Sequence, residues 1–79
     1  MSNRAKLQVD LAGSWRLYQH AVPPGWEILG TVQRGMEIGA LARHKVTGNL
    51  SMMRAGAASM LDQRKASAAL EAAQNGPQR

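Results

Sequence analysis

The stretch from Trp26 to Asp62 most constrains the fold, because short apolar segments alternate in it with turn residues. In the first segment apolar and polar residues alternate with a period of two, which is typical of a half-buried strand. One face would carry Trp26, Ile28, Gly30 and Val32. The other face would carry Glu27, Leu29, Thr31 and Gln33. A strand is therefore expected from Trp26 to about Gln33.

Two turns divide the rest of this stretch. Arg34-Gly35 predicts a tight turn, and the segment 45–49 predicts another, because Gly48 and Asn49 tolerate the positive φ that hairpin turns need. Strands starting near Met36 and Leu50 would follow these turns. The result is an antiparallel meander of three strands.

The residues before this meander predict a fourth strand and a short helix. Lys6 to Leu11 alternates with a period of two and suits an edge strand. Ser14 is a candidate N-cap for a helix from Trp15 to about Ala21. Pro23-Pro24-Gly25 would end that helix, because proline lacks a donor and restricts the residue before it.

A longer helix is expected after the meander. Asp62 is a good N-cap, and the alanine-rich segment from Gln63 to about Ala73 follows it. The apolar stripe of this helix would consist of Ala66, Ala69, Leu70 and Ala73. A start near Ala57 fits the pattern as well, so both starts remain open. Asn75-Gly76-Pro77 would end the helix.

Together these elements predict one α+β domain spanning residues 1–79. It would have a small antiparallel sheet of three to four strands, with a short N-terminal helix and a C-terminal helix packed on it. Residues 1–5 and 75–79 are expected to be disordered. The chain has no cysteine, so no disulfide can stabilise the fold. A single core of this size contributes at most about 3–5 kcal/mol to the free energy of unfolding.

Strand alternation also predicts an exposed apolar patch. If Met52 points into the core, Met53 points outward and shares the second face of the sheet with Leu29 and Leu41. Either the helix Trp15–Ala21 or a partner protein would cover this patch. The methionines expected to fill the core are Met36, Met52 and Met60.

Few residues in the chain suit catalysis. Glu27 and Glu37 could face each other across the first hairpin, but Arg34 and Arg43 lie near them as ordinary ion-pair partners. The histidines are His20 and His44, in different segments and without the ligand spacing of a zinc site. A protein without enzymatic activity, metal or cofactor is therefore expected.

Positive charge is the strongest compositional bias, with ten Lys and Arg against five Asp and Glu and a net charge of +5. Such a surface attracts nucleic acid or acidic proteins. The strands would gather a basic set consisting of Arg34, Arg43, Lys45 and Arg54. A sheet can enter the DNA major groove while arginines hold phosphates. The alternative is a solvated cationic face that keeps a small protein soluble.

The N-terminal segment is polar and charged, and it lacks the apolar core of a signal peptide. No stretch approaches the roughly 18 apolar residues of a membrane-spanning helix. We therefore expect a protein of the cytoplasm that does not enter membranes.

Four runs of the sequence, at residues 39–43, 47–49, 61–65 and 68–70, resemble small uncharacterised proteins of bacterial phages and prophages. The resemblance implies a bacterial host cell and a compact, non-catalytic regulator or inhibitor. Three functions follow as expectations. The first is a regulator that contacts nucleic acid through the basic set. The second is an inhibitor or adaptor that binds a host or defence complex through Leu29, Leu41 and Met53. The third is a homo-oligomeric structural protein.

Overall fold

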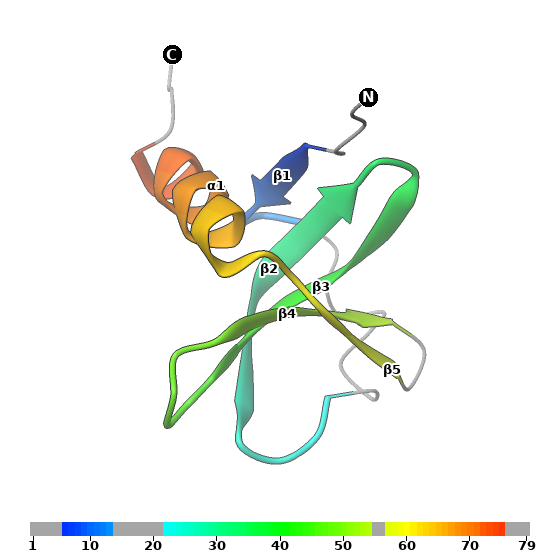
Figure 1. Cartoon of the computed structure of the whole chain (residues 1–79), viewed down its shortest axis with the longest axis vertical. Helices are drawn as coiled ribbons and strands as arrows, with labels where there is room; N and C mark the ends of the chain where they lie inside the picture. Colours follow the sequence, from blue (N-terminus) through cyan, green and yellow to red (C-terminus); the bar gives the residue numbers. More distant parts are fainter. Residues whose placement is uncertain (1–5, 14–21, 55–56, 76–79) are drawn as a thin grey trace.

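The structure, a computed structural model, describes residues 6–13, 22–54 and 57–75. It is an antiparallel five-stranded sheet in which each strand pairs with the next along the chain (Figure 1). The strands are β1 (Leu7–Asp10), β2 (Trp26–Arg34), β3 (Glu37–His44), β4 (Leu50–Arg54) and β5 (Ala57–Met60). One helix, α1 (Gln63–Asn75), follows them. The predicted α+β class and C-terminal helix are confirmed.

The sheet has five strands, which corrects the prediction of three to four. The additional strand is β5, where alanine and serine carry no alternating pattern. Pairing with β4, from Ser51 opposite Met60 to Arg54 opposite Ala57, makes this segment a strand despite its composition. The predicted helix Trp15–Ala21 lies outside the described residues, as do residues 1–5 and 76–79. Within the described part of the chain, α1 is the only helix.

The start of α1 is set by Asp62. Its carboxylate Oδ1 accepts a hydrogen bond of 3.1 Å from the backbone N–H of Lys65, which is the N-cap geometry. The alternative start near Ala57 is therefore wrong. Ala66 and Leu70 are buried, and Ala69 and Ala73 are half-buried, so the predicted apolar stripe is confirmed.

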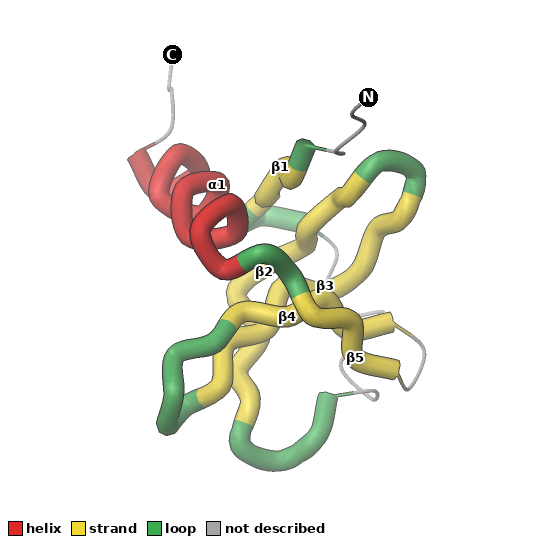
Figure 2. The backbone as a smooth tube through the Cα atoms, viewed as in Figure 1, coloured by secondary structure: helices red, strands yellow, loops and turns green. Residues whose placement is uncertain are grey.

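The sheet coils so that one face becomes concave, and α1 lies against that face. Strands β1 and β4 are not neighbours in the sheet, yet both contact α1. Figures 1 and 2 show β4 and β5 crossing in front of β2 and β3, with α1 beside β1. We call the face that α1 covers the inner face and the opposite one the outer face. The inner core consists of Val32, Leu41, Leu50, Met52, Leu61, Ala66 and Leu70.

The outer face has an apolar centre too, and this overturns the predicted patch. Met53 is 1% exposed and is buried with Ala40 and Ala42, while Trp26 and Ile28 pack against them. Leu41 is fully buried in the inner core. Leu29 is partly buried and packs against that same core. Because both faces are buried at the centre of the sheet, alternation alone could not indicate which face is exposed.

A β-bulge explains why the predicted faces of the β2 residues are wrong. The pairing with β3 skips Leu29, because Ile28 lies opposite Ala42 and Gly30 lies opposite Leu41. The residue inserted by a bulge moves every later residue to the other face. Trp26 and Ile28 therefore belong to the outer face, and Val32 belongs to the inner one.

Candidate nucleic-acid interface

The structure divides the predicted basic set into two centres at opposite ends of β3. At the start of β3, the guanidinium groups of Arg34 and Arg54 both bind the carboxylate of Glu37. At its end, Arg43 binds Glu27, and Lys45 follows in the turn. Glu37 and Arg43 are six positions apart in β3, which is about 20 Å of strand at ~3.3 Å per residue. The four residues do not form one cluster.

The first centre, the Arg34 centre, consists of Arg34, Glu37 and Arg54. The Arg34 guanidinium donates from Nε (3.1 Å) and Nη2 (2.9 Å) to Glu37 Oε1. It also donates to Ser59 Oγ at 3.0 Å and to the Met60 carbonyl oxygen at 3.3 Å. Arg34 thus joins the end of β2 to β5 across the coiled sheet. All of its nitrogens are used within the protein.

Arg54 in the same centre makes fewer hydrogen bonds than Arg34. Its Nη1 lies 3.3 Å from Glu37 Oε2, its single hydrogen bond within the described residues. Its side chain is 47% exposed, against 29% for Arg34. Two arginines share one carboxylate here, so the centre keeps a net charge of +1. Arg54 can present its remaining donors to an anion.

The second centre, the Arg43 centre, consists of Glu27, Arg43 and Lys45. Arg43 Nε and Nη2 lie 2.9 Å and 2.8 Å from Glu27 Oε2. Lys45 makes no ion pair within the described residues, so this centre also keeps a net charge of +1. The predicted pairing of Glu27 and Glu37 with arginines is confirmed, and these two carboxylates lie at opposite ends of β3.

Backbone and ring contacts fix the turn that carries Lys45. The backbone N–H of Lys45 donates to the Gly25 carbonyl oxygen at 2.8 Å. His44 Nδ1 accepts from the backbone N–H groups of Val46 and Thr47, each at 3.2 Å. The His44 and Trp26 rings also lie nearly perpendicular to each other, at 88°, with ring centroids 4.9 Å apart. The ammonium group of Lys45 therefore projects from an ordered hairpin.

Two methionines expected in the core are exposed instead. Met36, in the turn between β2 and β3, is 99% exposed, and Met60 is 67% exposed. Met52 fills the inner core as expected. Met36 and Met60 are associated with the Arg34 centre, because Arg34 binds the Met60 carbonyl and lies two residues before Met36. They bring apolar surface to that centre, whereas Leu41 and Met53 of the predicted patch are buried.

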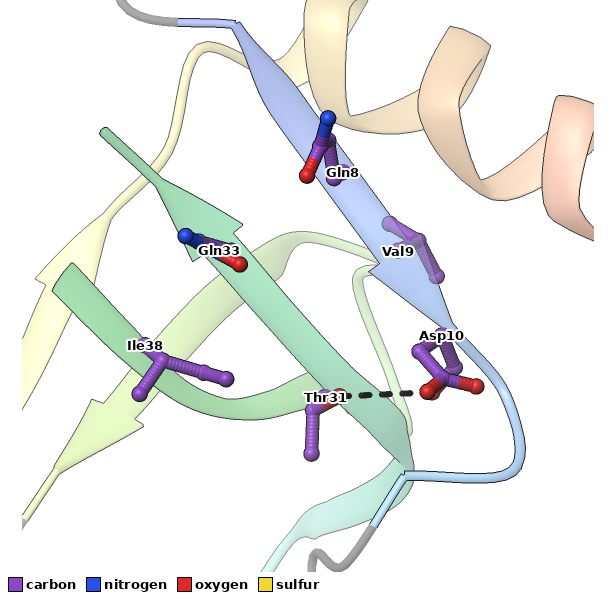
Figure 3. A pocket seen from close by; sticks show the side chains of 6 residues that line it. All are labelled: Gln8, Val9, Asp10, Thr31, Gln33 and Ile38. Atoms are coloured by element: carbon purple, nitrogen blue, oxygen red, sulfur yellow. Dashed lines mark hydrogen bonds between the residues drawn. The ribbon is translucent and has the colours of Figure 1, made fainter. Parts of the chain in front are cut away.

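A polar hollow that sequence reasoning missed lies on the outer face between β1 and β2 (Figure 3). It has a volume of about 300 Å³, and its lining residues are Gln8, Val9, Asp10, Thr31, Gln33 and Ile38. A second hollow of about 240 Å³ shares Gln8 and Gln33 with it and extends to Lys6 and Gly35. A sequence signal was present, because the polar residues Lys6, Gln8 and Asp10 alternate with apolar ones along β1 and the residue before it. The register that brings Gln8 opposite Gln33 was not predictable.

Among the described residues, no three His, Cys, Asp or Glu side chains gather as metal ligands would. Across the same residues, no helix has the length and apolar character needed to span a membrane. Comparison with known proteins found no matching family, no similar curated protein and no similar solved structure.

Proposed function

We propose that this chain is a small non-enzymatic binding protein that contacts nucleic acid, in the manner of a phage-type or bacterial regulator. The observation that supports this most is the charge left at both ends of β3. The Arg34 centre and the Arg43 centre each keep a net charge of +1 after their ion pairs are counted. Positive centres at a spacing of about 20 Å suit the evenly charged phosphate backbone of a nucleic acid.

The ion pairs support different proposed roles for the four basic residues. Arg34 and Arg43 hold carboxylates through two nitrogens each, so they position the two centres. Arg54 and Lys45 keep free donors in the described structure, so they are the phosphate contacts. Most protein–DNA hydrogen bonds go to the phosphates and sugars, and such contacts fix the register without reading sequence.

The salt dependence of DNA binding tests this assignment. In the double variant Arg54→Gln/Lys45→Gln, the slope of log K against log salt for a 20-base-pair duplex should become shallower by about 0.9 per lost contact. Fluorescence anisotropy with a labelled duplex gives this slope.

Arg64→Gln/Lys65→Gln is the matched control for the loss of two charges, because both residues are exposed on α1 and belong to neither centre. We expect that variant to leave the slope closer to that of the unmodified chain. If both double variants reduce the slope equally, only the net charge of the chain matters. If Arg54→Gln/Lys45→Gln leaves the slope unchanged, Arg54 and Lys45 do not contact phosphates.

A second candidate function is an inhibitor or adaptor for an acidic protein. The exposed Met36 and Met60 beside the Arg34 centre favour it, because interfaces combine apolar anchors with arginine. Capture from a bacterial lysate with and without nuclease separates the two functions. A partner protein that stays bound after nuclease and moderate salt favours the adaptor, and partners lost with nuclease favour nucleic-acid binding.

A further inference from the structure

The outer-face hollow brings two primary amides together. Gln8 and Gln33 lie directly opposite each other on neighbouring strands, and both are exposed. Gln33 Nε2 donates to the Gly35 carbonyl oxygen at 3.0 Å, which leaves Gln33 Oε1 as an acceptor. The Gln8 amide makes no hydrogen bond within the described residues. The hollow thus offers donors and acceptors side by side, with the aliphatic side chain of Ile38 as a wall (Figure 3).

The two ends of the hollow differ in the groups they offer. At the Asp10 end, the Thr31 hydroxyl donates to the Asp10 carbonyl oxygen, and Gly13 lies so close to Thr31 that a Cβ would have no room. Asp10 Oδ1 accepts from the backbone N–H of Ala12 at 2.9 Å, which leaves Oδ2 as an acceptor. At the other end the second hollow leads to Lys6.

The two ends of the hollow carry opposite charges. Lys6, the residue before β1, and Asp10, the last residue of β1, are four positions apart, which is about 13 Å at ~3.3 Å per residue. An anionic group is attracted to Lys6 at one end and repelled from Asp10 at the other. A group with an exocyclic amine suits the Asp10 end, because Asp10 and the glutamine oxygens accept hydrogen bonds.

We propose that this hollow binds one unpaired adenine nucleotide of a single-stranded nucleic acid, with the base on Gln8 and Gln33 and the phosphate on Lys6. Glutamine pairs with adenine through two hydrogen bonds, because its amide offers one donor and one acceptor. A concave site suits a single unstacked base, whereas the paired bases of a duplex present only their edges in a groove. The proposal rests on the proposed function only in that both require binding of nucleic acid.

The test uses labelled dA12 and dT12 with the full chain in fluorescence anisotropy. We expect the unmodified protein to bind dA12 about fivefold or more tightly than dT12. Gln8→Ala should abolish that preference and leave the dT12 affinity and the salt slope unchanged. Lys6→Gln should weaken both complexes and make the slope shallower by about 0.7, the value for one phosphate contact on a single strand.

Gln74→Ala and Lys65→Gln are the matched controls, because they remove the same groups from the exposed surface of α1. The proposal is overturned if dA12 and dT12 bind alike, if Gln8→Ala acts like Gln74→Ala, or if Lys6→Gln acts like Lys65→Gln. A Gln8→Ala variant that weakens binding of a dA·dT duplex as much as binding of dA12 would also overturn it, because the site is proposed for an unpaired base. If Arg54 and Lys45 control duplex binding while Gln8 and Lys6 do not matter, this site fails and the proposed function stands.

Discussion

At the scale of single residues, side chains of the same type have different roles because of the positions they occupy in the coiled sheet. Arg34 joins β2 to β5, whereas Arg54 beside it keeps free donors. Met53 is 1% exposed between the strands of the outer face, whereas Met60 is 67% exposed. The position in the fold therefore determines which basic residue can bind a phosphate and which methionine can be replaced without loss of stability.

Met53→Lys tests the burial of the outer face. Removing a buried methionine costs about 2–5 kcal/mol, and burying an unpaired ammonium group costs more. Because a core of this size supplies about 3–5 kcal/mol in total, the variant should be largely unfolded at 25 °C. Circular dichroism with thermal melting measures this, and Met60→Lys is the control that should melt close to the unmodified chain. A cooperative, nearly unchanged melt of Met53→Lys would show that Met53 is accessible.

At the scale of elements, short sequence patterns predicted the strands, turns and helix cap that depend only on neighbouring residues in the chain. The strand β1, the turns around Gly35 and Gly48 and the Asp62 N-cap follow from short patterns, and the structure confirms them. The bulge at Leu29 and the strand β5 depend on pairing with other strands, so the sequence of each segment alone could not predict them. The predicted assignment of β2 residues to the two faces of the sheet was wrong for the same reason, because the bulge reverses it after Leu29.

Close packing at Gly39 in β3 yields a prediction about the coiling of the sheet. A Cβ at this position would lie 2.6 Å from the Met53 carbonyl oxygen and 2.7 Å from side-chain atoms of Met52 and Arg54. Gly39→Ala should lower the free energy of unfolding by about 1–3 kcal/mol, because overpacking forces the strands apart. Urea denaturation followed by circular dichroism gives this value.

Gly48→Asn is the contrasting variant, because Gly48 has open space around it and asparagine tolerates its positive φ. It should change the free energy of unfolding less than Gly39→Ala does. A Gly39→Ala variant as stable as the unmodified chain would contradict the tight approach of β3 and β4.

At the scale of the whole molecule, the sequence predicted the excess of positive charge but not its arrangement. Net charge is a property of composition, and +5 follows from counting residues. Whether a given arginine is free depends on which carboxylate the register brings beside it, as Glu37 lies between Arg34 and Arg54. The two centres at the ends of β3 and the hollow between β1 and β2 could be recognised only once the register was known.

The central claim, that this positive charge serves to bind nucleic acid, is tested most directly by the affinity of the unmodified chain for a labelled 20-base-pair duplex. Anisotropy titrations between about 50 and 200 mM salt give the slope of log K against log salt. With contacts from both centres, the slope should be steeper than about −1.8, which corresponds to at least two phosphates at ~0.9 each. No measurable binding at 50 mM salt, or an affinity that does not change with salt, would contradict the claim.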